Sequence, residues 1–176
     1  MDQQDHNFAA GFRAFLSGFD WEGVTRMPYK EDGSAPFKAI SRQVLFADAE
    51  LGCELRYFEI AADGYSTLER HQHMHGVMIV RGAGLCLLGQ SVRQVAAFDL
   101  VTIRPWIWHQ FRATEGQSLG FLCMVNAARD KPQLPSADDL AGLRSVPEVA
   151  AFLDYGGTTV GNQGPRDPWP HLVTAG

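Results

Sequence analysis

A succession of short β-forming runs between about residues 39 and 126 constrains the fold of this chain more than any other feature. The runs are separated by turn-forming residues, and no helical pattern lies between them. Many short strands without intervening helices are typical of an antiparallel sandwich or barrel. The sequence therefore predicts an all-β domain with strands at Ser41–Phe46, Cys53–Ala61, Ser66–His75, Val77–Arg81, Gly84–Leu88, Gln90–Val95, Asp99–Ile103, His109–Ala113 and Leu119–Asn126.

The two flanks of this β region have a different pattern. Phe8, Phe12, Phe15 and Phe19 recur at helical spacing, which predicts an amphipathic helix over roughly residues 5–18. Beyond the strands, Ser136 precedes two aspartates, a pattern typical of a helix start. We expect an N-terminal helix and irregular connection over 1–38, a barrel over 39–127, a helical segment over 128–155 with helices at Ala137–Arg144 and Pro147–Leu153, and a Gly/Pro-rich tail over 156–176.

Length and charge limit the partners that this chain is expected to have. Its 176 residues suit one domain with a real core, and its formal net charge of −5 comes without a Lys/Arg cluster. We therefore expect neither nucleic acid nor a membrane as a partner. The N-terminus has no secretory pattern, so the three cysteines are expected to be reduced thiols in the cytoplasm.

Potential metal ligands stand at every second position between Glu69 and His75. Alternate side chains of a strand share one face, so a strand here would gather Glu69, His71, His73 and His75. His109, after Pro105, re-enters the β region as a further imidazole. The bland alternative is a polar strand facing solvent. Imidazoles gathered with a carboxylate are the usual ligands of a divalent transition metal, which is the interpretation that we favour.

The two histidine segments resemble the two motifs of the cupin family. Gly64 opens the first motif and Gly82 closes it, while Asp99, Pro105 and His109 follow the second, with Phe98 where the family has glycine. The resemblance covers about residues 40–126. It implies a double-stranded β-helix, also called a jelly-roll barrel, around one metal ion, and cupins are commonly homodimers.

The family register leaves two ligand sets open. Counting back from Gly82 implies Glu69, His71, His75 and His109 as ligands, with His73 as a spare imidazole for acid/base catalysis. The competing register pairs His71 with His73, and His75 is then a fourth ligand or none. Either set suits Mn, Fe, Co, Ni or Zn.

Other residues are candidates to line the pocket. An inward Arg56 or Arg112 would hold an anion in a protein of negative net charge, although a solvated or paired surface role is the commoner one for an arginine. Tyr57 follows Arg56 on the same strand and points to the opposite face. Trp106 and Trp108 would form an aromatic wall, although packing is an equally good interpretation of both. Cys123 faces the interior if Phe121 and Val125 do, and a nearby metal or histidine would lower its pKa and make it a nucleophile.

A narrower resemblance is to a bacterial cupin subgroup associated with RubisCO-like proteins. It is carried by the runs Leu55–Glu59, Glu69–His75, Trp108–Arg112, Phe121–Asn126 and Arg129–Pro135. The resemblance implies an enzyme that moves the methylthio group of 1-methylthio-xylulose 5-phosphate to a thiol such as glutathione. An Fe-dependent cupin dioxygenase and a non-catalytic metal-dependent sensor or binding module are the alternatives.

Overall fold

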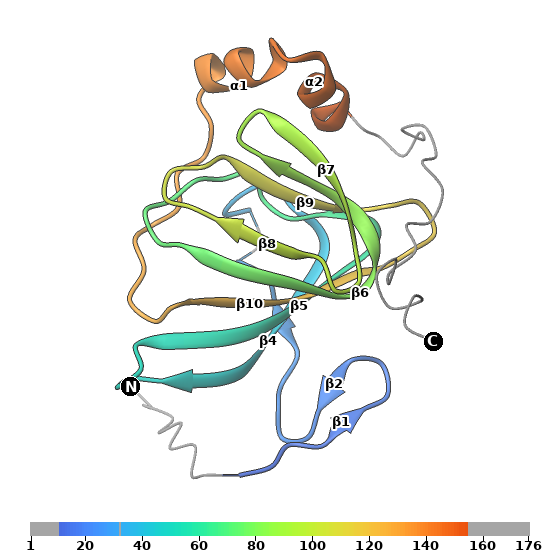
Figure 1. The fold of residues 1–176 in the computed structure, drawn as a ribbon, viewed down its shortest axis with the longest axis vertical. Helices are drawn as coiled ribbons and strands as arrows, with labels where there is room; N and C mark the ends of the chain where they lie inside the picture. Colours follow the sequence, from blue (N-terminus) through green and yellow to red (C-terminus); the bar gives the residue numbers. More distant parts are fainter. Residues whose placement is uncertain (1–10, 32, 155–176) are drawn as a thin grey trace, which may run out of the picture.

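Seven strands build a closed antiparallel barrel in the computed structural model, which describes residues 11–31 and 33–154. Strands β5 and β6 each pair with both β9 and β10, so the ladder returns on itself (Figure 1). This architecture confirms the all-β barrel expected from the sequence. The strands are β4 (Lys38–Asp48), β5 (Cys53–Tyr65), β6 (His75–Leu88), β7 (Ser91–Ala96), β8 (Leu100–Ile103), β9 (His109–Ala113) and β10 (Leu119–Asn126), with a short β3 (Met27–Pro28) beside β4.

The barrel interior is filled by alternate side chains of these strands. Phe121 of β10 stacks on Phe58 of β5 with ring centroids 5.4 Å apart, and on Phe111 of β9 at 4.7 Å. Ile60 and Ile79 are fully buried in the same cluster. Burying each such side chain contributes about 1.5–3 kcal/mol, so the interior rather than the turns stabilises the barrel.

The N-terminal segment is not the helix that its phenylalanine spacing predicts. Residues 5–10 of that prediction lie outside the described part, and the rest forms a two-stranded hairpin of β1 (Phe15–Leu16) and β2 (Asp20–Trp21). Gly18, at φ +79°, turns the chain and would interrupt a helix. Phe19 then stacks on Tyr57 at 5.6 Å, and Trp21 meets the same ring at 5.1 Å. The tertiary contact with β5 therefore overrides the local helical pattern.

The strand predicted over Ser66–His75 is also wrong over most of its length. Glu69 and Arg70 make only single bridges, to His109 and Gln133, and β6 begins at His75. The backbone N–H groups of Gln72 and His73 donate to the Asp130 carboxylate instead of to a neighbouring strand. Because side-chain acceptors compete with the ladder, this segment is irregular.

Both predicted C-terminal helices are confirmed. α1 (Ala137–Arg144) begins with a capping box between Ser136 and Asp139, and α2 (Pro147–Leu153) begins with proline at its first turn. The two helices lie together at one end of the barrel (Figure 1), where Val149 and Phe152 are buried. The tail predicted over 156–176 lies outside the described residues, in which no helix is long and apolar enough to span a membrane. The expected homodimer stays a prediction.

Candidate metal centre

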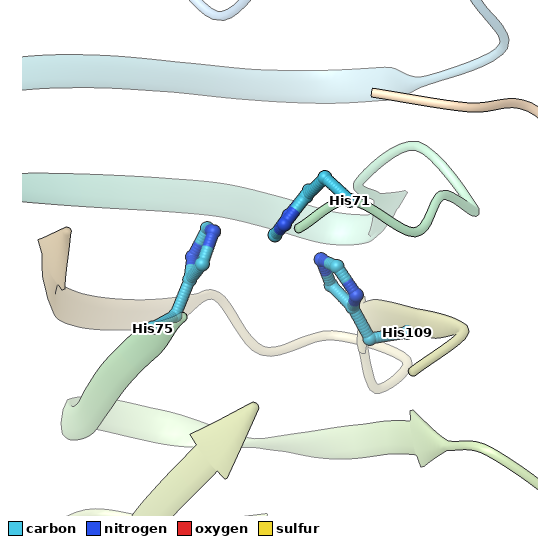
Figure 2. Close-up of side chains that lie close together, drawn as sticks. All are labelled: His71, His75 and His109. Carbon is cyan, nitrogen blue, oxygen red and sulfur yellow. The ribbon is translucent and has the colours of Figure 1, made fainter. Parts of the chain in front are cut away.

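Three histidines from separate parts of the chain converge inside the barrel. His75 begins β6, His109 begins β9, and His71 comes from the irregular segment before β6 (Figure 2). One ring nitrogen from each lies within 4.8 Å of the others. The chain folds this way because Glu69 and His109 exchange two backbone hydrogen bonds, of 3.2 and 3.0 Å, which fix the first motif against the second.

The Nδ1 atom of each of these histidines lies within hydrogen-bond distance of another polar atom. His71 Nδ1 lies 2.8 Å from the His73 carbonyl oxygen, and His109 Nδ1 lies 2.9 Å from that of Ile107. A carbonyl only accepts, so Nδ1 carries the proton and Nε2 is left with a lone pair. The Nε2 atoms of His71 and His75 are buried and have no hydrogen-bond partner among the described residues. An imidazole held by a carbonyl at Nδ1, as in His71 and His109, presents Nε2 to a divalent metal, whereas Nδ1 of His75 lies 3.1 Å from Cys123 Sγ.

The electrostatic setting keeps these rings neutral. Burial is the largest cause, and it lowers the pKa of His71 and of His109 to about 4. Burial and the neighbouring imidazoles together lower the pKa of His75 to about 2. A metal ligand must be the unprotonated imidazole, so all three rings are in the required form near neutral pH.

Glu69 borders the same cavity but does not join the three histidines. Its buried carboxylate accepts a hydrogen bond from Lys30 Nζ, a partner that the sequence did not reveal because Lys30 lies in the irregular N-terminal connection. Burial raises the pKa of Glu69, and the charge of Lys30 opposes that rise. Among the described residues, the metal-ligand group that contains His75 and His109 consists of three histidines without Glu69. A fourth ligand at Glu69 stays a prediction.

His73 lies against the outer side of this group rather than in it. Its ring stacks on that of His71 with centroids 3.6 Å apart, and its Nδ1 lies 2.6 Å from Asp130 Oδ1. Hydrogen bonds from the backbone, Gln72 N–H first, hold the pKa of Asp130 well below its usual range. Asp130 was not identified from the sequence, although it lies in the Arg129–Pro135 run. His71, His73 and Asp130 form a second group whose ligand atoms lie within 4.8 Å of one another.

Cys123 is brought directly to the histidine group. Its Sγ lies 3.1 Å from His75 Nδ1, and its side chain borders the cavity that Glu69, His75 and His109 also line. None of the three cysteines is disulfide-bonded. The thiol pKa, however, does not follow the expected direction: burial raises it to about 11, and the charges of Arg56 and Arg129 oppose that rise. Cys123 is thus inside, but its surroundings do not lower the pKa of its thiol.

The other candidate pocket residues lie on different faces of the barrel strands, one on the inner face and two on the outer face. Arg56 is the cross-strand partner of Cys123 and therefore points to the same face. Tyr57, one residue on, points outward, where its hydroxyl donates to Glu59 at 2.6 Å under the N-terminal hairpin. Arg112 also lies outside, with its guanidinium 4.7 Å from the Tyr65 ring and 5.0 Å from that of Phe152. Neither Tyr57 nor Arg112 borders the cavity beside Cys123, and their roles as substrate contacts stay predictions.

The two tryptophans differ from each other. Trp108 is buried in the cluster with Leu143 and Phe152, and Arg70 covers its ring at 4.4 Å, so it packs the helices onto the barrel. Trp106 is 46% exposed and lines a groove beside α1. Its backbone has φ +63°, and its N–H donates to the His71 carbonyl oxygen at 2.8 Å. Both tryptophans line this groove, Trp106 with the larger exposed surface, and the aromatic wall expected of them stays a prediction.

Comparison with known proteins identifies the fold and the family. Residues 56–125 match the cupin domain. The chain is 59% identical to 1-methylthio-D-xylulose 5-phosphate methylsulfurylase of Rhodospirillum rubrum over 150 residues, which cover 85% of this chain and 96% of the relative. The resemblance drawn from the sequence motifs is therefore confirmed.

Solved structures agree. A cupin 2 conserved barrel protein from Rhodopseudomonas palustris is 58% identical, with a TM-score of 0.77 over 81% of this chain and 98% of that one. A cupin-2 domain from Rhodospirillum rubrum is 59% identical, with a TM-score of 0.74 over 81% and 96%. One from Halorhodospira halophila is 38% identical, with a TM-score of 0.62 over 85% and 99%. With the two motifs, the closed barrel and these relatives in agreement, the chain belongs to the cupin family.

Proposed function

We propose that this protein is a metal-dependent cupin enzyme that transfers the methylthio group of 1-methylthio-xylulose 5-phosphate to a thiol such as glutathione. The observation that carries the proposal is the 3.1 Å contact between Cys123 Sγ and His75 Nδ1 at a cavity that His109 also lines. A thiol within hydrogen-bond distance of an imidazole of the proposed metal site suits sulfur transfer. The name of the relative from Rhodospirillum rubrum supports the same substrate.

Cys123 would act as the relay for sulfur. Its thiolate attacks the methylthio sulfur, the bond between that sulfur and C1 breaks, and the electron pair stays on the sugar as the enolate of the C2 ketone. Protonation at C1 then gives 1-deoxyxylulose 5-phosphate. The external thiol attacks the methyl disulfide left on Cys123, takes the methylthio group as a new mixed disulfide and releases the Cys123 thiolate. The sulfur is oxidised and C1 is reduced, so no further redox partner is needed.

His71, His75 and His109 would hold the metal, with Glu69 as the proposed fourth ligand, and the donor set suits Mn, Fe, Co, Ni or Zn. The metal would supply Lewis-acid polarisation of the sugar carbonyl, which makes the enolate a better leaving group. His75 Nδ1–H would donate to the Cys123 thiolate and offset part of its burial. His73, oriented by Asp130, would move the proton.

Two further residues would contact the substrate. Arg56 shares the inner face with Cys123 and would bind an anionic group there. Trp106 lines the groove beside α1, and its backbone N–H donates to the His71 carbonyl oxygen, so its exposed ring would contact a ligand that enters this groove.

The test is transfer by the native protein and by Cys123→Ser, under anaerobic conditions and with each candidate metal. We expect the native protein to release 1-deoxyxylulose 5-phosphate and, without external thiol, to gain the mass of one methylthio group on Cys123. Cys53→Ser is the matched control because Cys53 is also a free thiol but lies at the start of β5. Full transfer by Cys123→Ser would overturn the relay. A requirement for oxygen would favour the dioxygenase, and binding without turnover would favour a sensor.

A further inference from the structure

Several buried polar atoms on the inner face of β4 and β5 lack hydrogen-bond partners among the described residues. Arg56 is only 8% exposed, and its Nη2 and Nε atoms have no hydrogen-bond partner within the part of the chain that the structure describes. The same holds for Nε of Arg42. A buried guanidinium without its hydrogen bonds is costly, so a ligand that accepts those bonds is favoured.

These atoms belong to a group of three arginines and one glutamate, which we call the arginine cluster: Arg42, Glu54, Arg56 and Arg129. Arg42 is the cross-strand partner of Phe58, which puts it on the same face as Arg56. Glu54 Oε2 lies 3.1 Å from Arg56 Nε and 3.0 Å from Arg129 Nη1. The contact with Arg56 is a close charge contact that is not aligned as a hydrogen bond, because Arg56 Nε still lacks a partner among the described residues.

The charges of the cluster do not balance. Three guanidinium groups face one carboxylate, which leaves an excess of two positive charges in a protein whose formal net charge is −5. Burial first, and then the charges of Arg129 and Arg42, lower the pKa of Arg56, so the three cations lie close enough to repel one another. A dianion would relieve this repulsion, whereas a single carboxylate would relieve only half of the excess charge.

The cluster also lies at the right place for one end of the substrate. Arg56 and Cys123 are directly opposite on β5 and β10, where Cβ atoms are about 4.5–5.5 Å apart. The Phe58 ring lies 5.8 Å from the Arg56 guanidinium carbon and leaves the edge of that group to a ligand. A ligand that reacts at Cys123 therefore reaches the cluster with its other end.

We propose that the arginine cluster is the subsite for the phosphate group of a phosphorylated ketose, with Arg42 and Arg56 donating to the phosphate oxygens. The assignment rests on the proposed sugar-phosphate chemistry and deepens it. Arginine matches phosphate through planar, charge-assisted hydrogen bonds, which are about twice as strong as neutral ones. Glu54 fixes the flank of the cluster and excludes a second anion.

Calorimetric titration of the metal-loaded protein with D-xylulose 5-phosphate and with D-xylulose tests the proposal. We expect Arg56→Met and Arg42→Met each to weaken the binding of D-xylulose 5-phosphate by roughly 10–100-fold. The affinity for D-xylulose, which is lower in the native protein, should stay unchanged. Inorganic phosphate should compete in the native protein. Arg93→Met, at an exposed position of β7, is the matched control.

Native affinity in both variants would overturn the subsite, as would equal binding of the two ligands by the native protein. Loss of glutathione binding instead of sugar-phosphate binding would assign the cluster to a carboxylate and overturn the phosphate assignment. If Arg56→Met does not fold, the same titrations of Arg42→Met and Arg129→Met test the subsite. Failure of methylthio transfer with phosphate-dependent binding intact would refute the proposed function and leave the subsite standing.

Discussion

Asp130 closes the segment that carries three of the histidines, and its replacement gives a quantitative test of the metal centre. Its carboxylate accepts the N–H groups of Gln72 and His73, at 2.8 and 3.1 Å, and lies 2.6 Å from His73 Nδ1. In the described part of the chain, no strand ladder supports Gln72 or His73. Without Asp130, the N–H groups of Gln72 and His73 lose their acceptor, while the backbone bonds of Glu69, Arg70 and His71 remain, so ligand geometry should loosen without loss of the barrel.

The expected magnitude follows from how many of these hydrogen bonds each substitution removes. Removing a group that orients metal ligands costs roughly 10–100-fold in metal affinity. Asp130→Ala removes all three interactions, so we expect metal affinity to fall near the upper end of that range, roughly 100-fold. Asp130→Asn keeps one oxygen, which serves both His73 donors, so its effect should be near the lower end, roughly tenfold.

The assay is competition for the metal between protein stripped by a chelator and a chromophoric chelator, with Asp138→Ala as the exposed aspartate control on α1. Metal affinity within about twofold of native in Asp130→Ala would refute the reasoning. A complete and equal loss in both variants would instead make Asp130 a direct ligand, in keeping with the His71, His73 and Asp130 group.

Three further perturbations test the site and the fold. His109→Ala should lose both bound metal and activity, and full metal occupancy by elemental analysis would contradict its role as a ligand. In the unfolded chain His71 and His109 take up protons below about pH 6.5, whereas in the folded protein their pKa values are about 4. Lowering the pH from about 6.5 to about 4 should therefore decrease the free energy of unfolding of the metal-free protein. Urea denaturation should show this slope, and His109→Gln should flatten it; an unchanged slope would contradict the assignment. Gly120→Ala would place a Cβ 2.2 Å from the Tyr57 hydroxyl and should destabilise the fold by about 1–3 kcal/mol, whereas Gly142→Ala in α1, with no atom within 4 Å, should not lower the denaturation midpoint.

Patterns with a short range were predictable from the sequence. The Ala137–Arg144 and Pro147–Leu153 helices were predicted with the bounds found, because capping residues act within one turn. The phenylalanine repeat misled because the partner that decides its conformation, Tyr57, lies far along the chain. Strand alternation correctly placed Arg56 on one face and Tyr57 on the other, but it did not say which face lies inside.

The candidate site divides in the same way. Histidine spacing indicated the imidazoles, and their gathering inside the barrel agrees with it, although the segment is not the strand that was expected. Lys30, Asp130 and Arg42 were not identified, since each contacts the site from a distant segment and carries no local signal. Arg112 lies on the outer face beside Phe152 of α2, a contact that its neighbours in the sequence do not reveal.

The sequence by itself determined the barrel, its family and the histidines, because turn residues, strand alternation and motif spacing act locally and survive without a partner. Only the tertiary structure decided that Cys123 contacts His75, that Glu69 pairs with Lys30 and that Arg42 and Arg56 lie together with nitrogens that lack a partner among the described residues. Those contacts depend on which strands the barrel brings side by side and on how far burial removes water from the charges. Charge pairing and orphaned hydrogen bonds are properties of that enclosed space, so no stretch of the sequence contains them.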